Sequence, residues 1–216
     1  MPLEDKKILV TGSRGFSAKY LIELLQKETS HQIFCDEGDL SQLTEVENLL
    51  QRVRPDQIYH LAGSFTNHYE TDYKNNVLTT KNIFDALLVL GMKARVLIIG
   101  SAAEYGVPRE NPISENSPLE PVTIYGVTKT FQTHLMQFYT ASHHLDIVMA
   151  RPFNLFGLGI SEQLFIGKVY AQIERFKEGL IDKIVLDDLS GERDYIDIEE
   201  AVRWYQKIME KGVSGK

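Results

Sequence analysis

The sequence has little of several features that would point to particular classes of protein. It contains one cysteine, Cys35, so no intrachain disulfide can form, which is typical of a reducing compartment. Its most hydrophobic stretch, residues 86–100, is interrupted by Lys93 and Arg95 and is too short to span a bilayer. The N-terminal residues form no apolar signal core. We therefore expect a cytoplasmic protein with no membrane partner.

Positive charge is also in the minority. The chain has 23 Lys and Arg against 30 Asp and Glu, which gives a net charge of −7. A chain of this sign gains nothing from counterion release, so we expect no nucleic-acid partner. The 216 residues are 43% hydrophobic and 25% charged, as in an ordinary globular protein. At about 150 residues per domain, this length predicts one domain with an appendage.

Short apolar runs alternate with amphipathic segments along nearly the whole chain. The runs are rich in Ile, Val and Leu without clean alternation, which is typical of strands covered on both faces. We expect strands at residues 7–10, 32–35, 57–61, 95–99, 146–150 and 183–186. Between them, apolar stripes at helical spacing predict helices over residues 18–25, 43–53, 83–88 and 127–138. This alternation predicts an α/β fold, a doubly wound, Rossmann-like parallel sheet that binds ligands at the carboxyl ends of its strands.

One segment breaks this alternation. Residues 104–122 carry four prolines, at positions 108, 112, 118 and 121. Proline cannot donate to a sheet or continue a helix, so the segment is expected to be an irregular loop before a helix that starts near Tyr125.

The turn after the first expected strand carries glycines at a spacing suited to phosphate. Gly12 and Gly15, followed by the small Ala18, stand between a strand and an amphipathic helix. Gly12 permits a tight turn, Gly15 lets the backbone approach a pyrophosphate, and the helix N-terminus offers free N–H groups. An ordinary turn of an α/β protein is the alternative.

Two charged residues bear on the choice of dinucleotide. Asp36 ends the second expected strand, 24 positions after Gly12. An acid at about this spacing binds the ribose diol of NAD and repels the 2′-phosphate of NADP. Arg14, inside the glycine turn, favours NADP instead because a guanidinium can pair with that phosphate. We expect NAD or NADP, with NAD slightly favoured; a solvated turn residue is the alternative for Asp36.

A tyrosine and a lysine stand four positions apart on one face of an expected helix. Tyr125 and Lys129 form the only Tyr-x-x-x-Lys in the chain, and Ser101 follows the strand at 95–99. This trio suits hydride transfer at a carbinol, with Tyr125 moving the proton and Ser101 bound to the oxygen. The tyrosine pKa, ordinarily about 10, would have to fall by roughly 3 units, which a nearby ammonium and a cationic nicotinamide favour. A chance surface pair is the alternative.

Several motifs in order along the chain carry a family resemblance. They are the glycine turn Thr11–Phe16, Asp39-Leu40, His60-Leu61-Ala62-Gly63, Asn75-Asn76-Val77, Gly100-Ser101 with Tyr105-Gly106, Tyr125 to Lys129, Arg151-Pro152-Phe153-Asn154, and Arg193-Asp194-Tyr195. Together they resemble the extended short-chain dehydrogenases/reductases, the NAD-dependent epimerase/dehydratase family. The most similar branch is that of GDP-mannose 4,6-dehydratase and GDP-4-keto-6-deoxy-mannose reductase.

The resemblance implies roles for individual residues. Cofactor-binding residues would be Gly12, Gly15, Phe16, Asp39, Leu40, Leu61, Ala62, Gly63 and Asn76, together with Tyr125 and Lys129. Arg14 and Asp36 join this set by their position and charge, as argued above. Substrate would contact Ser101, Asn154 and Arg193, the last of which would bind the sugar nucleotide. A salt bridge from Arg193 to Asp194 or Glu192 is the alternative. No spacing of His, Cys and Asp resembles a metal site, so no metal is expected.

Three departures from the family pattern change these expectations. The dehydratases place an acid directly after the catalytic hydroxyl residue, where this chain has Ala102 and Ala103, and we expect Glu104 to point elsewhere. Asp36 and Asp39 are crowded together, as if one strand and its helix were deleted beside the adenine pocket. The chain also stops where relatives continue, so we expect a dinucleotide-binding domain at 1–154 and, at 155–216, partial elements of an incomplete C-terminal substrate lobe with a returning strand and helix.

These observations favour an NAD(P)-dependent oxidoreductase acting on C4 of a nucleotide-linked 4-keto-6-deoxy sugar. The alternatives are a nucleotide-sugar 4-epimerase and a cofactor-binding protein without turnover, while 4,6-dehydration is disfavoured. We also expect a homodimer, because the helix from Tyr125 carries a wide apolar strip of Val127, Phe131, Leu135 and Phe138, with Met136 and Tyr139 beside it. Coverage of that strip by the 104–122 loop is the alternative.

Overall fold

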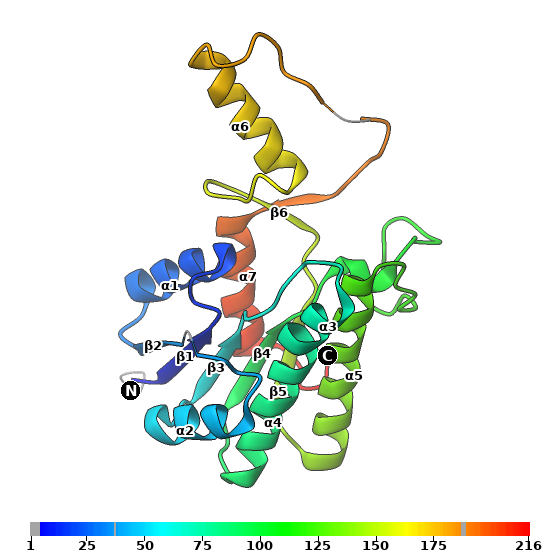
Figure 1. The fold of residues 1–216 in the computed structure, drawn as a ribbon. Helices are drawn as coiled ribbons and strands as arrows, with labels where there is room; N and C mark the ends of the chain where they lie inside the picture. The colour runs from blue at the N-terminus through cyan, green and yellow to red at the C-terminus, as the bar shows by residue number, and fades with distance from the viewer. Residues whose placement is uncertain (1–4, 37, 187–188) are drawn as a thin grey trace.

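The computed structural model describes residues 5–36, 38–186 and 189–216, and its centre is a parallel sheet (Figure 1). Five strands pair in the order β2-β1-β3-β4-β5. Their bounds are β1 Lys7–Thr11, β2 Gln32–Asp36, β3 Gln57–His60, β4 Arg95–Ile99 and β5 Ile147–Ala150. The predicted parallel sheet is confirmed, and five of the six expected strands lie where the apolar runs placed them.

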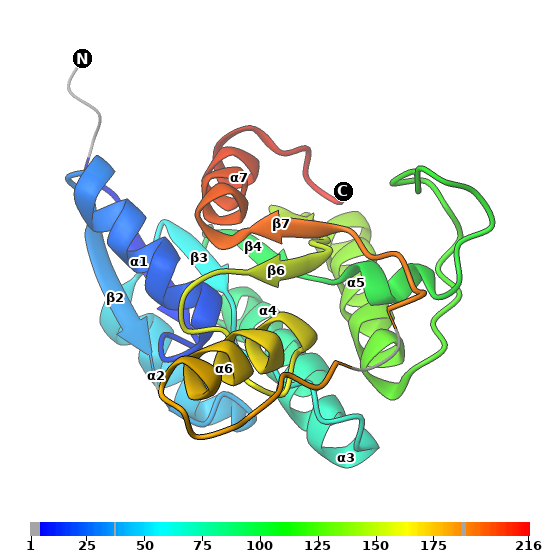
Figure 2. The ribbon, with the colours of Figure 1, turned by 90° about the horizontal axis from the view of Figure 1, so that it is seen from above.

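Helices cover both faces of this sheet (Figure 2). On one face, α1 (Phe16–Glu28) packs against α7 (Ile198–Lys211) over one apolar core. On the other face, α2 (Leu43–Val53), α4 (Thr79–Val89) and α5 (Ile124–His143) enclose a second core. The two cores explain the unbroken apolar runs, because β3 and β5 are buried along their whole length.

β2 is the edge strand of the sheet, at the position where a further strand and its helix were expected to be missing. β2 pairs with β1 alone, and the chain passes from β2 through α2 directly to β3 on the other side of β1. This agrees with the deletion inferred from the crowding of Asp36 and Asp39. The end of β2 and the loop after it therefore form the margin of the site.

The segment between β6 (Asn154–Phe156) and β7 (Tyr195–Asp197) projects from the sheet (Figure 1). These two strands pair in parallel and return the chain to α7. The projecting part carries α6 (Phe165–Lys177), whose residues are exposed or half-buried, with Gly167 alone buried. The strand predicted at 183–186 is wrong: the backbone of Val185 pairs instead with the Gln172 side chain, at 2.8 Å in both directions.

The apolar strip on α5 divides between core and surface. Met136 and Tyr139 are buried, whereas 37% of Phe131 and 53% of Phe138 is exposed. The alternative that the 104–122 loop covers the strip is therefore wrong for these two rings, since the loop lines the ligand cleft instead. Within the described residues, no helix is both long and apolar enough to cross a membrane.

Candidate active site

A cleft runs along the carboxyl ends of the strands and consists of two adjoining cavities. The first, of about 370 Å³, lies over the glycine turn and the end of β2. The second, of about 940 Å³, runs from the glycine turn past Ser101 and Tyr125 to the projecting segment. Between them the cavities are lined by every residue predicted to bind cofactor or substrate except Asn76. The individual roles of these residues stay predictions.

The glycine turn has the shape that a pyrophosphate requires. Gly12 has a φ of +66°, and a Cβ added there would overlap the backbone of Ala62. The Gly15 N–H closes the turn on the Gly12 carbonyl at 2.9 Å. The N-cap residue of α1 is Gly15, which has no side chain to cap the helix, and the first helical residues, Phe16, Ser17 and Ala18, face the second cavity. Free N–H groups at a helix N-terminus that opens on a cleft fit a dinucleotide diphosphate.

The end of β2 supplies the adenosine side of the first cavity. Asp36 Oδ2 accepts a hydrogen bond from the Gly38 N–H at 3.1 Å, and Arg14 lines the same cavity. Asp39 accepts from the Ser41 N–H at 3.0 Å and pairs with Lys74 at 3.1 Å. The Ser41 hydrogen bonds, with help from Lys74, hold the pKa of Asp39 below its ordinary value, so this carboxylate is ionised.

Tyr125 and Lys129 meet Ser101 at the middle of the second cavity. The side chain of Thr123 accepts from the Gly126 N–H at 3.0 Å and so begins α5 just before Tyr125. Lys129 Nζ lies 5.6 Å from the centre of the Tyr125 ring and donates to the Ile99 carbonyl at 2.8 Å. The Ser101 hydroxyl is close enough to the Tyr125 phenol to lower its pKa. The structure thus brings the predicted trio together.

Burial is the largest influence on the pKa values of Tyr125 and Lys129. It raises the pKa of Tyr125 to about 12, against a lowering by the Ser101 hydrogen bond. It lowers the pKa of Lys129 to about 8, against the opposing charges of Glu104 and Asp72. The expected depression of the tyrosine pKa is therefore absent from the protein alone. A neutral phenol beside an ammonium is a proton donor at neutral pH.

The loop after β3 adds contacts that the motifs did not reveal. The Phe65 ring lies edge-on to the Tyr125 ring, with 4.8 Å between centres. Asn67 Oδ1 accepts from the Tyr125 N–H at 3.3 Å. The loop is held by Asp72, a buried carboxylate of α3 (Tyr69–Asp72) that accepts from Ser64, Thr66 and Asn67 at 2.7–3.2 Å. The Ser-Phe-Thr-Asn run just past a strand end was the available signal for this loop.

Asn76 differs from its expected role at the cofactor. It is fully buried in the π-helix η1 (Tyr73–Leu78) and lines neither cavity. Its amide bonds the Ser64 N–H at 2.8 Å, the Ser64 carbonyl at 3.0 Å and the Thr128 hydroxyl at 2.9 Å. The side chain thus joins the loop after β3 to α5, and both its amide oxygen and its amide nitrogen are engaged in these hydrogen bonds.

The residues after Ser101 form the 3₁₀ turn η2 (Ala102–Tyr105). Ala102 and Ala103 line the second cavity and carry no proton to donate, whereas Glu104 is fully buried against Arg151. The expectation that Glu104 points away from the cleft is confirmed. No acid stands at the two positions where a dehydratase needs one.

The far end of the cleft carries the predicted substrate contacts. Asn154 lies in β6 and donates to the Asp194 carbonyl at 2.9 Å, and Arg193 donates to the Glu192 carbonyl at 2.7 Å. Both line the second cavity together with Asp194. Among the described residues, no group of three or more His, Cys, Asp and Glu is arranged to hold a metal.

This fold and cleft define a dinucleotide-binding α/β protein with a Ser, Tyr and Lys trio. Comparison with known proteins places it further: the model of the NAD dependent epimerase/dehydratase family matches residues 8–216. The chain belongs to this family, which confirms the resemblance carried by its motifs and the nicotinamide dinucleotide class of cofactor.

Individual relatives agree with this assignment. The chain is 30% identical over 213 residues to a GDP-6-deoxy-D-talose 4-dehydrogenase of Aggregatibacter actinomycetemcomitans, covering 95% of this chain and 70% of that one. It is 28% identical over 221 residues to a GDP-6-deoxy-D-mannose reductase of Pseudomonas aeruginosa, covering 97% and 72%. The structure of RMD from Pseudomonas aeruginosa complexed with NADPH matches with a TM-score of 0.88 and 26% identity, over 97% of this chain and 75% of that one.

Proposed function

We propose that this chain is an NAD(P)-dependent oxidoreductase that interconverts a keto and a hydroxyl group at C4 of a GDP-linked 6-deoxy sugar. The observation that carries the proposal is the meeting of Ser101, Tyr125 and Lys129 in one cleft with the glycine turn, beside two alanines in place of a dehydratase acid. The names of the two relatives, a 4-dehydrogenase and a reductase of GDP-linked 6-deoxy sugars, support the same position and substrate class.

The residues present divide the work of this reaction. The bound nicotinamide supplies or accepts the hydride. In the reductive direction the Tyr125 hydroxyl, which is protonated at neutral pH, gives its proton to the C4 oxygen. The Lys129 ammonium stabilises the phenolate left behind, and the Ser101 hydroxyl donates a hydrogen bond to the same substrate oxygen.

The family name also includes epimerases, and a Ser, Tyr and Lys trio suits hydride transfer at C4 in that reaction too. A 4-epimerase returns the hydride to the opposite face of the sugar, so the sugar must turn within the site between the two transfers. The trio and the predicted substrate contacts line one cavity of about 940 Å³, within which the sugar would turn. The two reactions differ in their balance: reduction consumes reduced cofactor and epimerisation does not.

The test is a spectroscopic assay of the chain with NADH or NADPH and a GDP-linked 4-keto-6-deoxyhexose. We expect stoichiometric loss of reduced-nicotinamide absorbance and a 4-hydroxy product. Tyr125→Phe is expected to abolish turnover while cofactor affinity stays within a few fold, because one hydroxyl is lost and the fold is untouched. Inversion at C4 of a GDP-6-deoxyhexose, without net use of cofactor, would identify an epimerase. Cofactor binding with neither reaction would show a binding protein without turnover.

We further infer that the chain forms a homodimer through α4 and α5, whose exposed apolar side chains include Phe131 and Phe138. Two such helix pairs related by a two-fold axis would bury these rings in a four-helix bundle. The cytoplasmic location stays a prediction from the sequence.

A further inference from the structure

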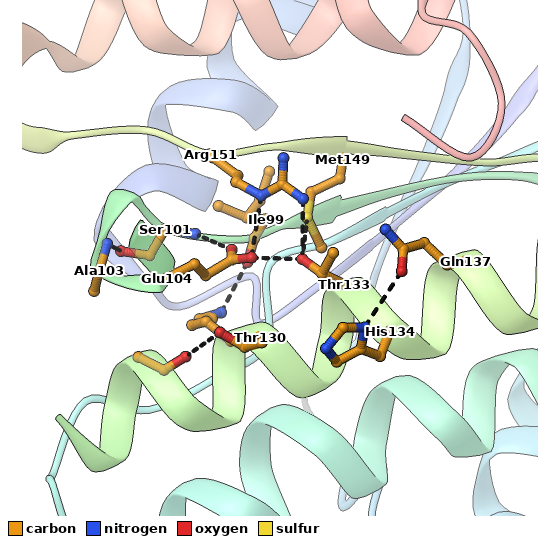
Figure 3. A network of polar contacts seen from close by, with 12 residues as sticks. Ile99, Ser101, Ala103, Glu104, Thr130, Thr133, His134, Gln137, Met149 and Arg151 are labelled. Carbon is orange, nitrogen blue, oxygen red and sulfur yellow. Dashed lines mark hydrogen bonds and ion pairs between the residues drawn. The ribbon is translucent and has the colours of Figure 1, made fainter. Parts of the chain in front are cut away.

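A buried ion pair lies directly behind the Ser101 turn (Figure 3). The Glu104 side chain is fully buried, and 18% of the Arg151 side chain is exposed. Arg151 Nε donates to Glu104 Oε2 at 3.0 Å, and the Thr133 hydroxyl donates to the same oxygen at 2.5 Å. The carboxylate is thus held by a residue of α5 and by a residue just after β5, which follow it in the chain by 29 and 47 positions.

The other carboxylate oxygen reaches the residue proposed to act on the substrate. Glu104 Oε1 accepts the Ser101 backbone N–H at 2.9 Å. Ser101 Oγ in turn accepts the Ala103 N–H at 3.1 Å, so Glu104 and Ser101 form a reciprocal capping box around η2. Gly100 makes room for this contact, because a Cβ there would overlap Glu104 Oε1.

Stability alone gives little reason for this pair. Replacing a buried ion pair by well-packed apolar residues is often neutral or stabilising, because the pair must first be desolvated. What the pair supplies is orientation: one oxygen is anchored by Arg151 and Thr133, and the other fixes the backbone of Ser101. The Ser101 hydroxyl is thereby held near Tyr125, whose pKa it lowers.

We propose that Glu104 is a positioning residue, whose buried carboxylate, anchored by Arg151, fixes the Ser101 backbone so that the serine hydroxyl faces Tyr125 and the C4 oxygen. The proposal rests on the proposed roles of Ser101 and Tyr125. It assigns Glu104 no contact with the substrate, which is consistent with its absence from the cavity lining.

Glu104 also acts on its neighbours through charge, and the test must separate the two effects. Its carboxylate and that of Asp72 raise the pKa of Lys129 and of Tyr125, against which the Ser101 hydrogen bond lowers the pKa of Tyr125. A change of charge at position 104 therefore alters Tyr125 directly. For this reason the effect of Ser101→Ala is compared within each Glu104 background.

The first readout needs neither substrate nor cofactor. The ring Cζ of Tyr125, assigned by its loss in Tyr125→Phe, reports by NMR at neutral pH whether its hydroxyl is hydrogen-bonded. With Glu104 present, Ser101→Ala should shift this resonance. In the Glu104→Met/Arg151→Met double variant, which removes the whole pair, and in Glu104→Asp, which keeps the charge on a shorter side chain, the same substitution should cause little shift.

The second readout is turnover. We expect Ser101→Ala to lower kcat by about 10²-fold and the Glu104 variants to lower it by about 10-fold, with KM and cofactor affinity within a few fold. A variant that carries both Ser101→Ala and a Glu104 substitution should lose no more kcat in total than Ser101→Ala alone, because the effects of residues that act through each other do not add. Thr133→Val is the comparison variant: it removes one of the two donors to Oε2 but keeps Arg151 and the Ser101 link to Oε1, so Ser101→Ala should still lower kcat in this background as in the wild type.

The outcomes are distinct. Thermal unfolding identifies which variants are folded. The comparison needs only one folded Glu104 variant, either the double variant or Glu104→Asp. An undiminished shift on Ser101→Ala in a folded variant, or additive losses of kcat, would overturn the positioning role. A wild-type chain without turnover would defeat the proposed function, and the NMR comparison would still decide the role of Glu104.

Discussion

Two residues at the margin of the first cavity act in opposite directions on the choice of cofactor. The Asp36 carboxylate stands at the end of β2, and Arg14 lines the same cavity. Because a carboxylate repels a 2′-phosphate, we predict that the chain binds NADH more tightly than NADPH. In Asp36→Asn this preference should fall by about 10-fold, or 1.4 kcal/mol. Calorimetric titration of both cofactors measures it. Tighter NADPH binding by the wild type would show that Arg14 prevails.

His60 makes stability depend on pH. It is fully buried between the hydroxyls of Thr11 and Thr80, at 2.7 and 3.0 Å. Burial, with a smaller effect of Lys129, lowers its pKa from 6.5 to about 3. Between these values the unfolded chain binds a proton that the folded chain does not. The free energy of unfolding should therefore fall as the pH drops through this window, by up to about 1.4 kcal/mol per pH unit.

Urea unfolding at a series of pH values measures this dependence. His60→Gln retains hydrogen-bonding groups and should remove this contribution to the slope. The exposed His134→Gln is the matched control and should leave the slope unchanged. An equal slope in wild type and His60→Gln would show that other groups cause the acid sensitivity.

At the scale of elements, α3 and η1 organise the loop that contacts Tyr125. Asp72 holds that loop by hydrogen bonds at Ser64, Thr66 and Asn67. Asp72→Asn removes the charge and replaces an acceptor by a donor, which leaves buried N–H groups unpaired. We predict a loss of about 1–3 kcal/mol in unfolding free energy and a lower kcat, because Phe65 and Asn67 no longer steady Tyr125.

Chemical unfolding and steady-state assays check this prediction together. The control is Glu70→Gln in the same helix, where an exposed side chain should change stability by no more than about 0.5 kcal/mol. Full activity in Asp72→Asn would mean that the loop does not need this carboxylate to place Tyr125.

At the scale of the whole molecule, the exposed rings of α5 predict self-association. Phe131 and Phe138 are exposed on α5, a helix that packs against α4. Sedimentation at micromolar concentration should show a species of twice the 24.6 kDa chain mass. Phe131→Glu with Phe138→Glu should give a monomer, because charges in an apolar interface are costly to bury.

The control for this experiment is Phe176→Glu, an equally large change on an exposed ring of α6. It should leave the mass unchanged if association uses α4 and α5. A wild-type species at the mass of one chain would contradict the dimer, and dissociation by Phe176→Glu would move the interface to the projecting segment.

Local patterns predicted most of the central sheet. β1, β3 and β4 are short apolar runs buried on both faces, and the glycine turn lies directly before α1, as its spacing indicated. Residues 183–186 have the same composition and form no strand, because a strand also needs a neighbour to pair with. α6 and the pairing of β6 with β7 were likewise not placed by residue range, since a projecting helix and a two-stranded ribbon joined across nearly 40 residues have weak local signals.

The sequence by itself determined the fold class, the dinucleotide turn and the identity of the trio, because each depends on residues close together in the chain or at strand ends that a parallel sheet brings to one edge. Tertiary structure alone decided what the buried polar residues do. Asn76 has the family's motif but bonds Ser64 and Thr128 rather than the cleft. Glu104 became a support for Ser101 through Arg151, 47 positions away. A buried polar group must find partners, and which partners are within reach is a property of packing that no local pattern contains.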